Sequence, residues 1–349
     1  MRILFIAGTL GTGGAEKQLF AISSELKRKG HTLAVFSFTQ GEYYEFLLIN
    51  SGIKVYSSPR KKGKWKRLCA LYCACQEFNP NLLFSFHFFT NVYAAIFAYL
   101  FRIKSVGSVR STGIAEKKHN GIVSWLHYAL PNLICVNSEN AKINLNRIFY
   151  TRDNYLLQNI IDLSYFEFNE KVKKDSTMRL LFMGRYEEVK RPHEYLNLCQ
   201  KLVLSGTLKF EGFMLGNGPL LEDIKARVEA ENLPITVYPF QKDIYPFIQK
   251  SDILVSTSSY EGSPNVLLEA LACGIDVYLL KNGCYNNLEE YDLVNSFDDV
   301  FQMAESMAQW ELPTQEMRQK KRSFIELKHS SMIVGENLSN KLEKLCLMQ

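Results

Sequence analysis

Two glutamates eight positions apart, Glu261 and Glu269, are the side chains of this sequence whose spacing and surroundings most suggest chemistry. Glu269 lies within the segment 266–273, which is otherwise apolar, so no polar face is available to it. A carboxylate that is buried without a partner is strongly destabilising. A glutamate on the solvent side of a helix is the plain alternative. The pattern nevertheless favours a ligand that offers hydroxyl or N–H donors.

The residues around the two acids predict a short helix over about 264–273. Ser263 is a favourable N-cap, Pro264 suits the first helical position, and Gly274 suits a left-handed helix end. The first acid then lies in the loop before the helix, and the second lies in the helix interior.

A second polar segment, GRYEEVKRP at 184–192, follows an apolar run and precedes a predicted helix. Charged loops between strands and helices are common, which is the plain interpretation. Together with the N–H groups of Asn265 and Val266 at the helix start, however, Arg185 and Lys190 would offer cationic and dipolar contacts to one diphosphate. The sequence therefore predicts an anion-binding site made by two separate loops.

The glycine-rich segment GTLGTGGAE at 8–16 follows the first apolar run and opens a helix. Its spacing is not G-x-G-x-x-G, and no acid ends a second strand where a ribose would need it, so the indication of a dinucleotide site is weak. Gly13 and Gly14 would instead let backbone N–H groups approach a phosphate or a sugar.

Strand and helix patterns alternate along the chain and would position these loops. Buried strands are expected at 2–8, 32–38, 82–86, 105–109, 133–137, 180–184, 210–216, 236–240, 252–257 and 276–280. The predicted fold class is α/β, with two doubly wound Rossmann-like domains facing a central cleft and ligands at the carboxyl ends of the strands. The polar stretch 168–178 is the expected linker. The expected parts are a first domain at 1–168, a second at 169–319 and a helical tail returning to the first at 320–349.

Composition is that of a globular chain, since 349 residues with 47% hydrophobic and 22% charged suffice for two domains with full cores. The eight cysteines contain no C-x-x-C pair, so neither a zinc ribbon nor a redox motif is indicated, and reduced thiols in a cytoplasm are expected. The apolar N-terminus lacks a basic n-region and predicts a strand, not a signal peptide. Residues 82–101 have the length of a membrane span, but their pattern favours a strand followed by a buried helix over 91–101.

Positive charge is concentrated in the first half of the chain. Residues 1–170 contain 20 Lys and Arg against 11 Asp and Glu, whereas residues 171–349 contain 21 against 25. Much of the excess lies in 58–78, where a cationic opening with Trp65 leads into an apolar helix. A solvated loop and a core helix would explain it, and a surface on anionic lipid headgroups is the functional alternative. Nucleic acid is not expected, because no stacking platform or binding module accompanies the charge.

Four motifs resemble those of the retaining glycosyltransferases of family four, which have the GT-B fold. They are GTGGAEKQL at 11–19, GRYEEVKRP at 184–192, LGNGP at 215–219 and DILVSTSSYEGSPNVLLEALACG at 252–274. The last contains the family's E-x7-E motif in full. The resemblance covers about residues 1–280, and the second half resembles the family's nucleotide-binding domain.

The resemblance implies a role for each acid. Glu269 would bind the ribose hydroxyls of a nucleotide, and Glu261 would contact the donor sugar. Arg185 and Lys190 would bind the diphosphate, which Gly14 would approach from the other domain. Further contacts to the nucleotide sugar are expected from Gly13, Gly216, Phe240, Ser263, Asn265 and Val266.

No two aspartates are separated by one residue, so the D-x-D metal signature of the other major glycosyltransferase fold is absent, and we expect neither a metal nor a cofactor. Fixed cations and helix N-termini would then stabilise the departing diphosphate. For a retaining enzyme the resemblance implies attack from the leaving-group face, where a donor phosphate oxygen accepts the acceptor's proton. Glu261 would position the sugar and stabilise charge, and a covalent nucleophile at this residue is the minority alternative.

The sequence departs from the family's pattern at several places. Arg110 follows the strand 105–109, where the family often has His, and His87 at the end of the preceding strand is the nearest alternative. Both are candidate catalytic residues. Asp276 stands where the family usually has Pro, and the loop 281–291 resembles the family's phosphate loop only loosely.

The predicted function is transfer of a hexose-type sugar, with retention, from a nucleotide-diphosphate sugar to a glycan acceptor in cell-surface polysaccharide synthesis. UDP is favoured over GDP, and the acceptor is expected to be lipid-linked. The protein would be cytoplasmic and peripheral at the inner face of the plasma membrane, on anionic lipid contacted by residues 60–67. A sugar-nucleotide epimerase of the same architecture and a non-catalytic nucleotide-sugar-binding partner subunit are the alternatives.

Overall fold

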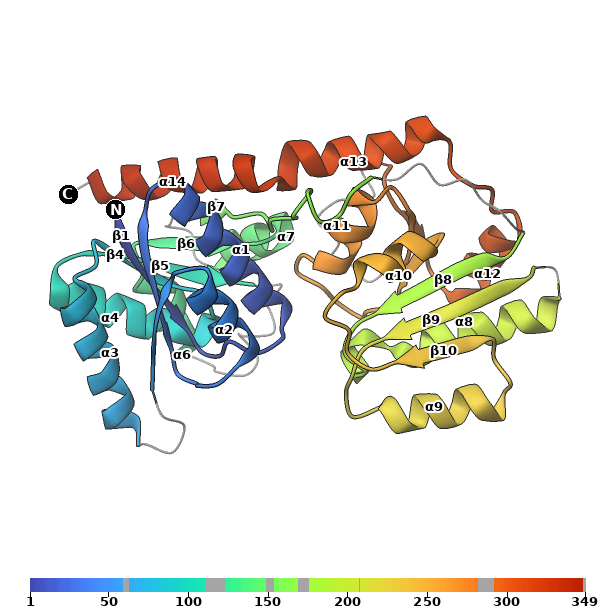
Figure 1. Cartoon of the computed structure of the whole chain (residues 1–349), viewed down its shortest axis with the longest axis horizontal. Coiled ribbons are helices and arrows are strands. Elements are labelled where there is room, and N and C mark those ends of the chain that lie inside the picture. Colours follow the sequence, from blue (N-terminus) through green and yellow to red (C-terminus); the bar gives the residue numbers. More distant parts are fainter. Residues whose placement is uncertain are drawn as a thin grey trace. The chain divides into compact units, whose positions relative to one another are not determined.

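The computed structural model describes residues 1–58, 63–110, 123–148, 154–168, 176–206, 208–281 and 292–347. The chain divides into two compact units, which we call unit 1 (Met1–Ile160 with Lys328–Gln349) and unit 2 (Ile161–Leu327) (Figure 1). The division falls before the one expected at 168/169, and the tail joins unit 1 from residue 328. Most of the expected linker, the basic residues 60–62 and the loop 282–291 lie outside the described residues.

Unit 1 is built on a parallel sheet whose described strands have the order β3-β2-β1-β4-β5-β6-β7. The strands are β1 (Arg2–Ala7), β2 (Thr32–Ser37), β3 (Lys54–Ser57), β4 (Leu82–Ser85), β5 (Lys104–Val109), β6 (Leu133–Val136) and β7 (Asn154–Leu156). The helices are α1 (Gly14–Arg28), α2 (Tyr43–Asn50), α3 (Lys64–Phe78), η1 (Phe88–Thr90), α4 (Asn91–Phe101), α6 (Val123–Ala129), α7 (Glu139–Ile148) and α14 (Ser331–Leu347).

Both faces of this sheet are covered, as the continuous apolar runs require. In β1, Ile3 and Phe5 pack into the core formed with α1, α2 and α14, whereas Leu4 and Ile6 pack into the core formed with α3 and α4. Successive side chains of a strand point to opposite faces, so an unbroken apolar strand needs a helical layer on each side. Residues 82–101 accordingly form β4, η1 and α4, as predicted, but α4 is buried on one side only, because Ile96, Tyr99 and Leu100 are exposed. In the part of the chain that is described, no helix is long and apolar enough to cross a membrane.

Unit 2 repeats the scheme with described strands in the order β10-β9-β8-β11-β12-β13, also parallel. The strands are β8 (Met178–Met183), β9 (Phe210–Leu215), β10 (Ile235–Tyr238), β11 (Ile253–Ser256), β12 (Asp276–Leu280) and β13 (Asn295–Phe297). The helices are η2 (Glu188–Lys190), α8 (Pro192–Ser205), α9 (Leu221–Ala230), α10 (Tyr245–Lys250), α11 (Asn265–Ala272), α12 (Val300–Ala308) and α13 (Gln315–His329), the last of which ends in unit 1.

The helix α11 is one residue shorter at each end than predicted. Pro264 is its N-cap, with an extended ψ of 116°, and Ser263 is not, which corrects the predicted cap. The φ of proline is compatible with the cap as well as with the first turn, and here the chain becomes helical only at Asn265. Gly274 has the positive φ of 74° that was expected at the helix end.

Candidate functional site

Glu269 lies in the interior of α11, and its side chain is only 1% exposed. The neighbours Leu268 and Ala270 are buried as well, which confirms the prediction of an acid within an apolar, packed helix. The helix starts at Asn265 and Val266, and both residues are half-buried. Their N–H groups belong to the first turn and point toward the segment that precedes the helix.

The loops that follow β8 and β11 are joined by backbone and side-chain hydrogen bonds. Thr257 donates from Oγ1 to the carbonyl oxygens of Lys190 and Arg191, both at 2.8 Å. Arg191 donates in turn from Nε to the carbonyl of Thr257 at 2.6 Å, and the N–H of Ser259 donates to Val189 at 2.8 Å. Two loops far apart in the sequence therefore form one rigid junction at the carboxyl ends of neighbouring strands.

This junction brings two of the predicted site residues into contact. Lys190 forms an ion pair with Glu261, which also accepts a hydrogen bond of 2.7 Å from Ser258 Oγ. Arg185 is not part of this group, because its side chain is 74% exposed and pairs with Glu187 at 2.6 Å. The structure thus places a half-buried ammonium and carboxylate together, whereas the second predicted cation is exposed and pairs with another acid.

The remaining predicted contacts of unit 2 lie at the ends of β9 and β10. A Cβ atom at Gly216 would lie 1.9 Å from the carbonyl oxygen of Gly184, so only glycine allows these two backbones to approach. Gly216 donates its N–H to the carbonyl of Tyr238 at 3.2 Å. Phe240 follows β10 and exposes its ring, which makes it suited to stacking on a planar ligand.

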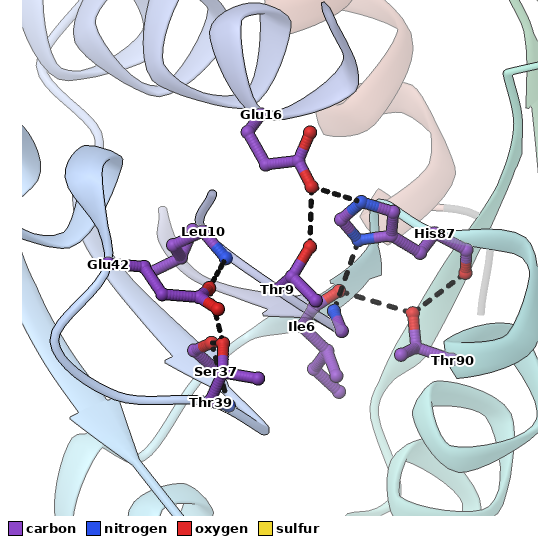
Figure 2. A network of polar contacts seen from close by, with 10 residues as sticks. Ile6, Thr9, Leu10, Glu16, Ser37, Thr39, Glu42, His87 and Thr90 are labelled. Atoms are coloured by element: carbon purple, nitrogen blue, oxygen red, sulfur yellow. Dashed lines mark hydrogen bonds and ion pairs between the residues drawn. The ribbon is translucent and has the colours of Figure 1, made fainter. Parts of the chain in front are cut away.

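In unit 1 a polar network ties the loop after β1 to the end of β4 (Figure 2). Glu16 accepts a hydrogen bond of 2.5 Å from Thr9 Oγ1 and lies 3.3 Å from His87 Nε2. The N–H of Gly8 donates to His87 Nδ1 at 3.1 Å, which assigns the proton of the neutral ring to Nε2. Both ring nitrogens of His87 therefore have partners within unit 1, and its catalytic role stays a prediction.

Glu16 is nearly buried but remains a carboxylate. Burial raises its pKa, but hydrogen bonds from His87 and Thr9 and the attraction of His87 outweigh burial and lower the pKa below its ordinary value. The same carboxylate explains why position 13 is a glycine, because a Cβ atom there would lie 2.2 Å from Glu16 Oε2. The glycine keeps room for an acid that folds back on the loop.

A second acid holds the other side of this loop. Glu42 accepts hydrogen bonds from the N–H of Leu10 and from Thr39 Oγ1, the latter at 2.6 Å (Figure 2). In addition, Tyr44 donates its N–H to the carbonyl of Leu10 at 2.9 Å. The loops after β1 and β2 are thereby fixed to each other.

Arg110 lies at the carboxyl end of β5 with its guanidinium 4.3 Å above the ring of Phe86. Its Nη1 donates to Asn159 Oδ1 at 3.2 Å and to the carbonyl of Leu157 at 3.4 Å. Burial lowers its pKa to about 10, so the group stays charged at neutral pH, while burial raises the pKa of the adjacent Cys135 thiol to about 12 and leaves it neutral. Within the described residues Nε and Nη2 have no hydrogen-bond partner, and they could donate to an anionic oxygen.

Several residues of these networks were not predicted from the sequence. Thr9, Glu16 and Glu42 fix the loops of unit 1, and Ser258 supports Glu261 in unit 2. Thr9 and Ser258 directly follow predicted strands, and Glu16 and Glu42 lie at the starts of helices. These positions are the one signal in the sequence that could have identified them.

Two family models match the chain in succession. The model described as "Glycosyltransferase Family 4" matches residues 12–165, and the model described as "Glycosyl transferases group 1" matches residues 165–288. The first range contains Glu16, Glu42 and His87, and the second contains Lys190, Glu261 and Glu269.

Individual proteins are more distantly similar. An undecaprenol-linked glycan alpha-1,4-N-acetyl-D-galactosaminyltransferase of Campylobacter jejuni is 23% identical over 307 residues, which span 83% of this chain and 81% of that protein. The putative glycosyltransferase EpsF of Bacillus subtilis is 32% identical over 132 residues, which span 35% of this chain and 34% of EpsF. The crystal structure of Anabaena HepE in complex with UDP superposes with a TM-score of 0.82 at 15% identity, over 99% of this chain and 100% of HepE. That superposition shows the GT-B fold.

Proposed function

Because the chain belongs to the glycosyltransferases of group 1 and family four, we propose that it transfers a sugar, with retention, from a UDP-sugar to a lipid-linked glycan in cell-surface polysaccharide synthesis. One observation carries the proposal. The junction of two loops in unit 2 holds Lys190 against Glu261 directly before α11, whose interior buries Glu269. A cation, an acid and a helix start are the groups needed to hold a diphosphate and a sugar.

In this proposal the nucleotide binds to unit 2. Glu269 accepts hydrogen bonds from the ribose hydroxyls, for which its carboxylate offers two oxygens. Phe240 contacts the base, and Gly216 lets the backbone come close to the nucleotide. The diphosphate is held by Arg185 and Lys190 and by the first N–H groups of α11, with Ser263, Asn265 and Val266 as the contributing residues.

The chemistry is a substitution at the anomeric carbon. The bond from this carbon to the donor phosphate oxygen breaks, and its electron pair leaves with the diphosphate, which Lys190 and Arg185 stabilise. The acceptor hydroxyl attacks from the same face and gives its proton to a phosphate oxygen. Glu261 positions the sugar through the contacts that fix it to Ser258 and Lys190.

The loops of unit 1 form the acceptor side of the enzyme. Gly13 and Gly14 let the backbone come close to the nucleotide sugar, and Arg110 and His87 are the side chains assigned to catalysis or orientation on this side. The Campylobacter jejuni relative acts on an undecaprenol-diphosphate glycan by its name, and HepE has been crystallised with UDP and with UDP-glucose. The first similarity supports a lipid-linked acceptor and the second supports a UDP-sugar donor. In this proposal the reaction takes place in the cytoplasm, at the inner face of the plasma membrane.

The proposal is tested by incubating the protein with a panel of UDP- and GDP-sugars and measuring the release of nucleotide. We expect slow release of UDP from one or a few UDP-sugars without acceptor, because water can replace the acceptor hydroxyl. The released sugar, followed by NMR before it mutarotates, should keep the anomeric configuration of the donor.

The outcomes separate the proposal from its alternatives. Conversion of the donor into an epimer without sugar transfer would identify an epimerase. UDP binding without turnover of any donor, with or without lipid-linked acceptors, would identify a non-catalytic partner subunit. Release with inverted configuration would contradict retention.

A further inference from the structure

The outer face of α4 is apolar and exposed. The helix contains no charged residue, and Ala94 and Phe97 anchor its inner face in the core of unit 1. On the opposite side Ile96 is exposed, as are Tyr99 at 86% and Leu100 at 61%. These three side chains fall on one side of a helix with 3.6 residues per turn, so the helix presents an apolar stripe that the described part of the chain leaves exposed.

The neighbouring helices α3 and α6 extend this stripe. Tyr72 of α3 packs its ring 5.4 Å from that of Phe101 at the end of α4, and α6 packs beside α4. Trp65 at the start of α3 is 81% exposed, and Trp125 of α6 is exposed as well. We call the exposed side chains of this layer the α3-α4-α6 face, and it consists of Trp65, Tyr72, Tyr93, Ile96, Tyr99, Leu100, Trp125 and Leu126.

The residues that border this face are cationic. Lys66 follows Trp65 on α3, and Arg102 lies directly after α4, both exposed to solvent. The helices α4 and α6 contain no acidic residue, and the exposed Glu77 of α3 forms an ion pair with Lys54. Tryptophan and tyrosine side chains prefer the headgroup region of a bilayer, and lysine and arginine are attracted to anionic headgroups. This combination of chemistry fits a lipid surface better than a protein partner.

We propose that the α3-α4-α6 face is inserted into the headgroup region of an anionic bilayer and holds unit 1 at the membrane. The inference deepens the proposed function and rests on it for the lipid-linked acceptor. It differs from docking through the basic residues 60–67 alone, because Coulomb attraction is screened by salt whereas apolar burial is not. Binding should therefore persist in part at high ionic strength.

Vesicle sedimentation tests the proposal with a matched pair of variants. The triple variant I96S/Y99S/L100S removes the apolar stripe of α4, and L204S/M317S removes two exposed apolar side chains of unit 2. With vesicles of phosphatidylglycerol and phosphatidylcholine we expect at least tenfold weaker binding for the triple variant and a change below twofold for the control. Equal binding of both variants, or complete release of the wild type at high salt, would overturn the inference.

Tryptophan fluorescence locates the face independently. The chain has three tryptophans, and Trp310 belongs to unit 2, where it donates from Nε1 to Asp276 at 2.7 Å. In vesicles with brominated acyl chains, a variant that retains only Trp125 should be quenched, and one that retains only Trp310 should not. Quenching of Trp310 alone, or of neither, would contradict the proposed orientation.

Two controls keep the inference separate from the proposed function. UDP release from a UDP-sugar in buffer without lipid reports on unit 2 and should be unchanged in the triple variant, so a failure of turnover and a failure of vesicle binding are distinguishable. Light scattering of the protein without vesicles reports self-association. A dimer that the triple variant dissociates, with no vesicle binding, would assign the face to a second copy of the chain and overturn the lipid assignment.

Discussion

The loops at the carboxyl ends of the two sheets use acidic residues in opposite ways. In unit 1, Glu16 and Glu42 accept hydrogen bonds from backbone N–H, hydroxyl and imidazole groups of the loops that they hold. In unit 2, Glu261 faces a lysine at a loop junction that hydroxyl and backbone contacts already fix. Glu16 and Glu42 therefore fix loops of unit 1, whereas Glu261 pairs with a lysine to which an anionic ligand can also bind.

This difference shows that a repeated fold does not repeat its site. Both sheets are doubly wound and parallel, and both place polar residues after their strands. Carboxylates that are satisfied by fixed donors contribute to stability, whereas the half-buried ammonium of Lys190 has three N–H donors and can contact a phosphate as well as Glu261. Substitutions in the two units should therefore separate stability from catalysis.

The largest effect is expected from Lys190→Ala in unit 2. The substitution removes the cation that faces Glu261, so we expect turnover to fall by about 10²–10³-fold, the loss typical of one stabilising group at a leaving oxygen. Arg185→Ala should lower turnover less, because that side chain is largely exposed. The surface residue Lys225, which pairs with Glu222, provides the control Lys225→Ala. Steady-state kinetics with a UDP-sugar measure the turnover of all three variants. Equal turnover in the wild type and Lys190→Ala would show that this cation has no part in the mechanism.

The pH dependence of stability tests the closure of unit 1 by its C-terminal segment. His329 is buried, and burial lowers its pKa to about 4 despite the hydrogen bond of 2.8 Å to the carbonyl of Asn159. Between about pH 6.5 and 4 the unfolded chain binds a proton at this residue and the folded chain does not, so stability should fall as the pH falls, by up to about 3 kcal/mol. Urea unfolding at several pH values should show that the free energy of unfolding depends less steeply on pH for His329→Gln. An unchanged pH dependence would show that His329 does not contribute to it.

The third prediction concerns the network of unit 1. Glu16→Gln removes a charged acceptor from Thr9 and His87 and should lower the free energy of unfolding by about 1–3 kcal/mol. Because the folded-state pKa of Glu16 is lowered, its contribution is present above its ordinary pKa and is lost as the pH falls through the folded value. UDP affinity should fall less than in Glu269→Gln, because the ribose contact is assigned to Glu269. The exposed Glu336, paired with Lys29, supplies the control Glu336→Gln, for which no loss is expected. A loss of UDP affinity without a loss of stability would show that Glu16 acts in binding rather than in folding, contrary to the role assigned to the acids of unit 1.

The smallest effect is expected from metal removal. If Lys190, Arg185 and the N–H groups of α11 stabilise the departing diphosphate, EDTA should leave turnover of a UDP-sugar unchanged. Loss of activity in EDTA that magnesium restores would assign part of this task to a metal ion.

Most of the strands of both units could be predicted from the sequence, because their signals are local. All ten expected strands are present, and α11 with its buried acid follows from an apolar run between proline and glycine. The short strands β3, β7 and β13 were missed, since each has only three or four residues, little burial and no apolar run. They add to a sheet that the longer strands have already formed.

The polar contacts were harder to predict than the elements. No pattern indicates that Thr257 binds the loop of Lys190 or that Glu42 reaches Leu10, because these pairs are 67 and 32 residues apart. The left-handed conformation at the end of α11 was predicted from Gly274, but the N-cap was misplaced by one residue. Proline is compatible with the N-cap as well as with the first helical position, so Pro264 does not by itself fix the helix start.

The central claim is that Glu269 binds a nucleotide in unit 2, and titration calorimetry with UDP tests it most directly. Glu269→Gln keeps the size of the side chain but removes a charge-assisted acceptor, so affinity should fall about 10- to 100-fold, or roughly 1–3 kcal/mol. The exposed Glu222 provides the control Glu222→Gln, which should bind UDP as the wild type does. A Glu269→Gln protein that is folded and binds UDP with wild-type affinity would contradict the account.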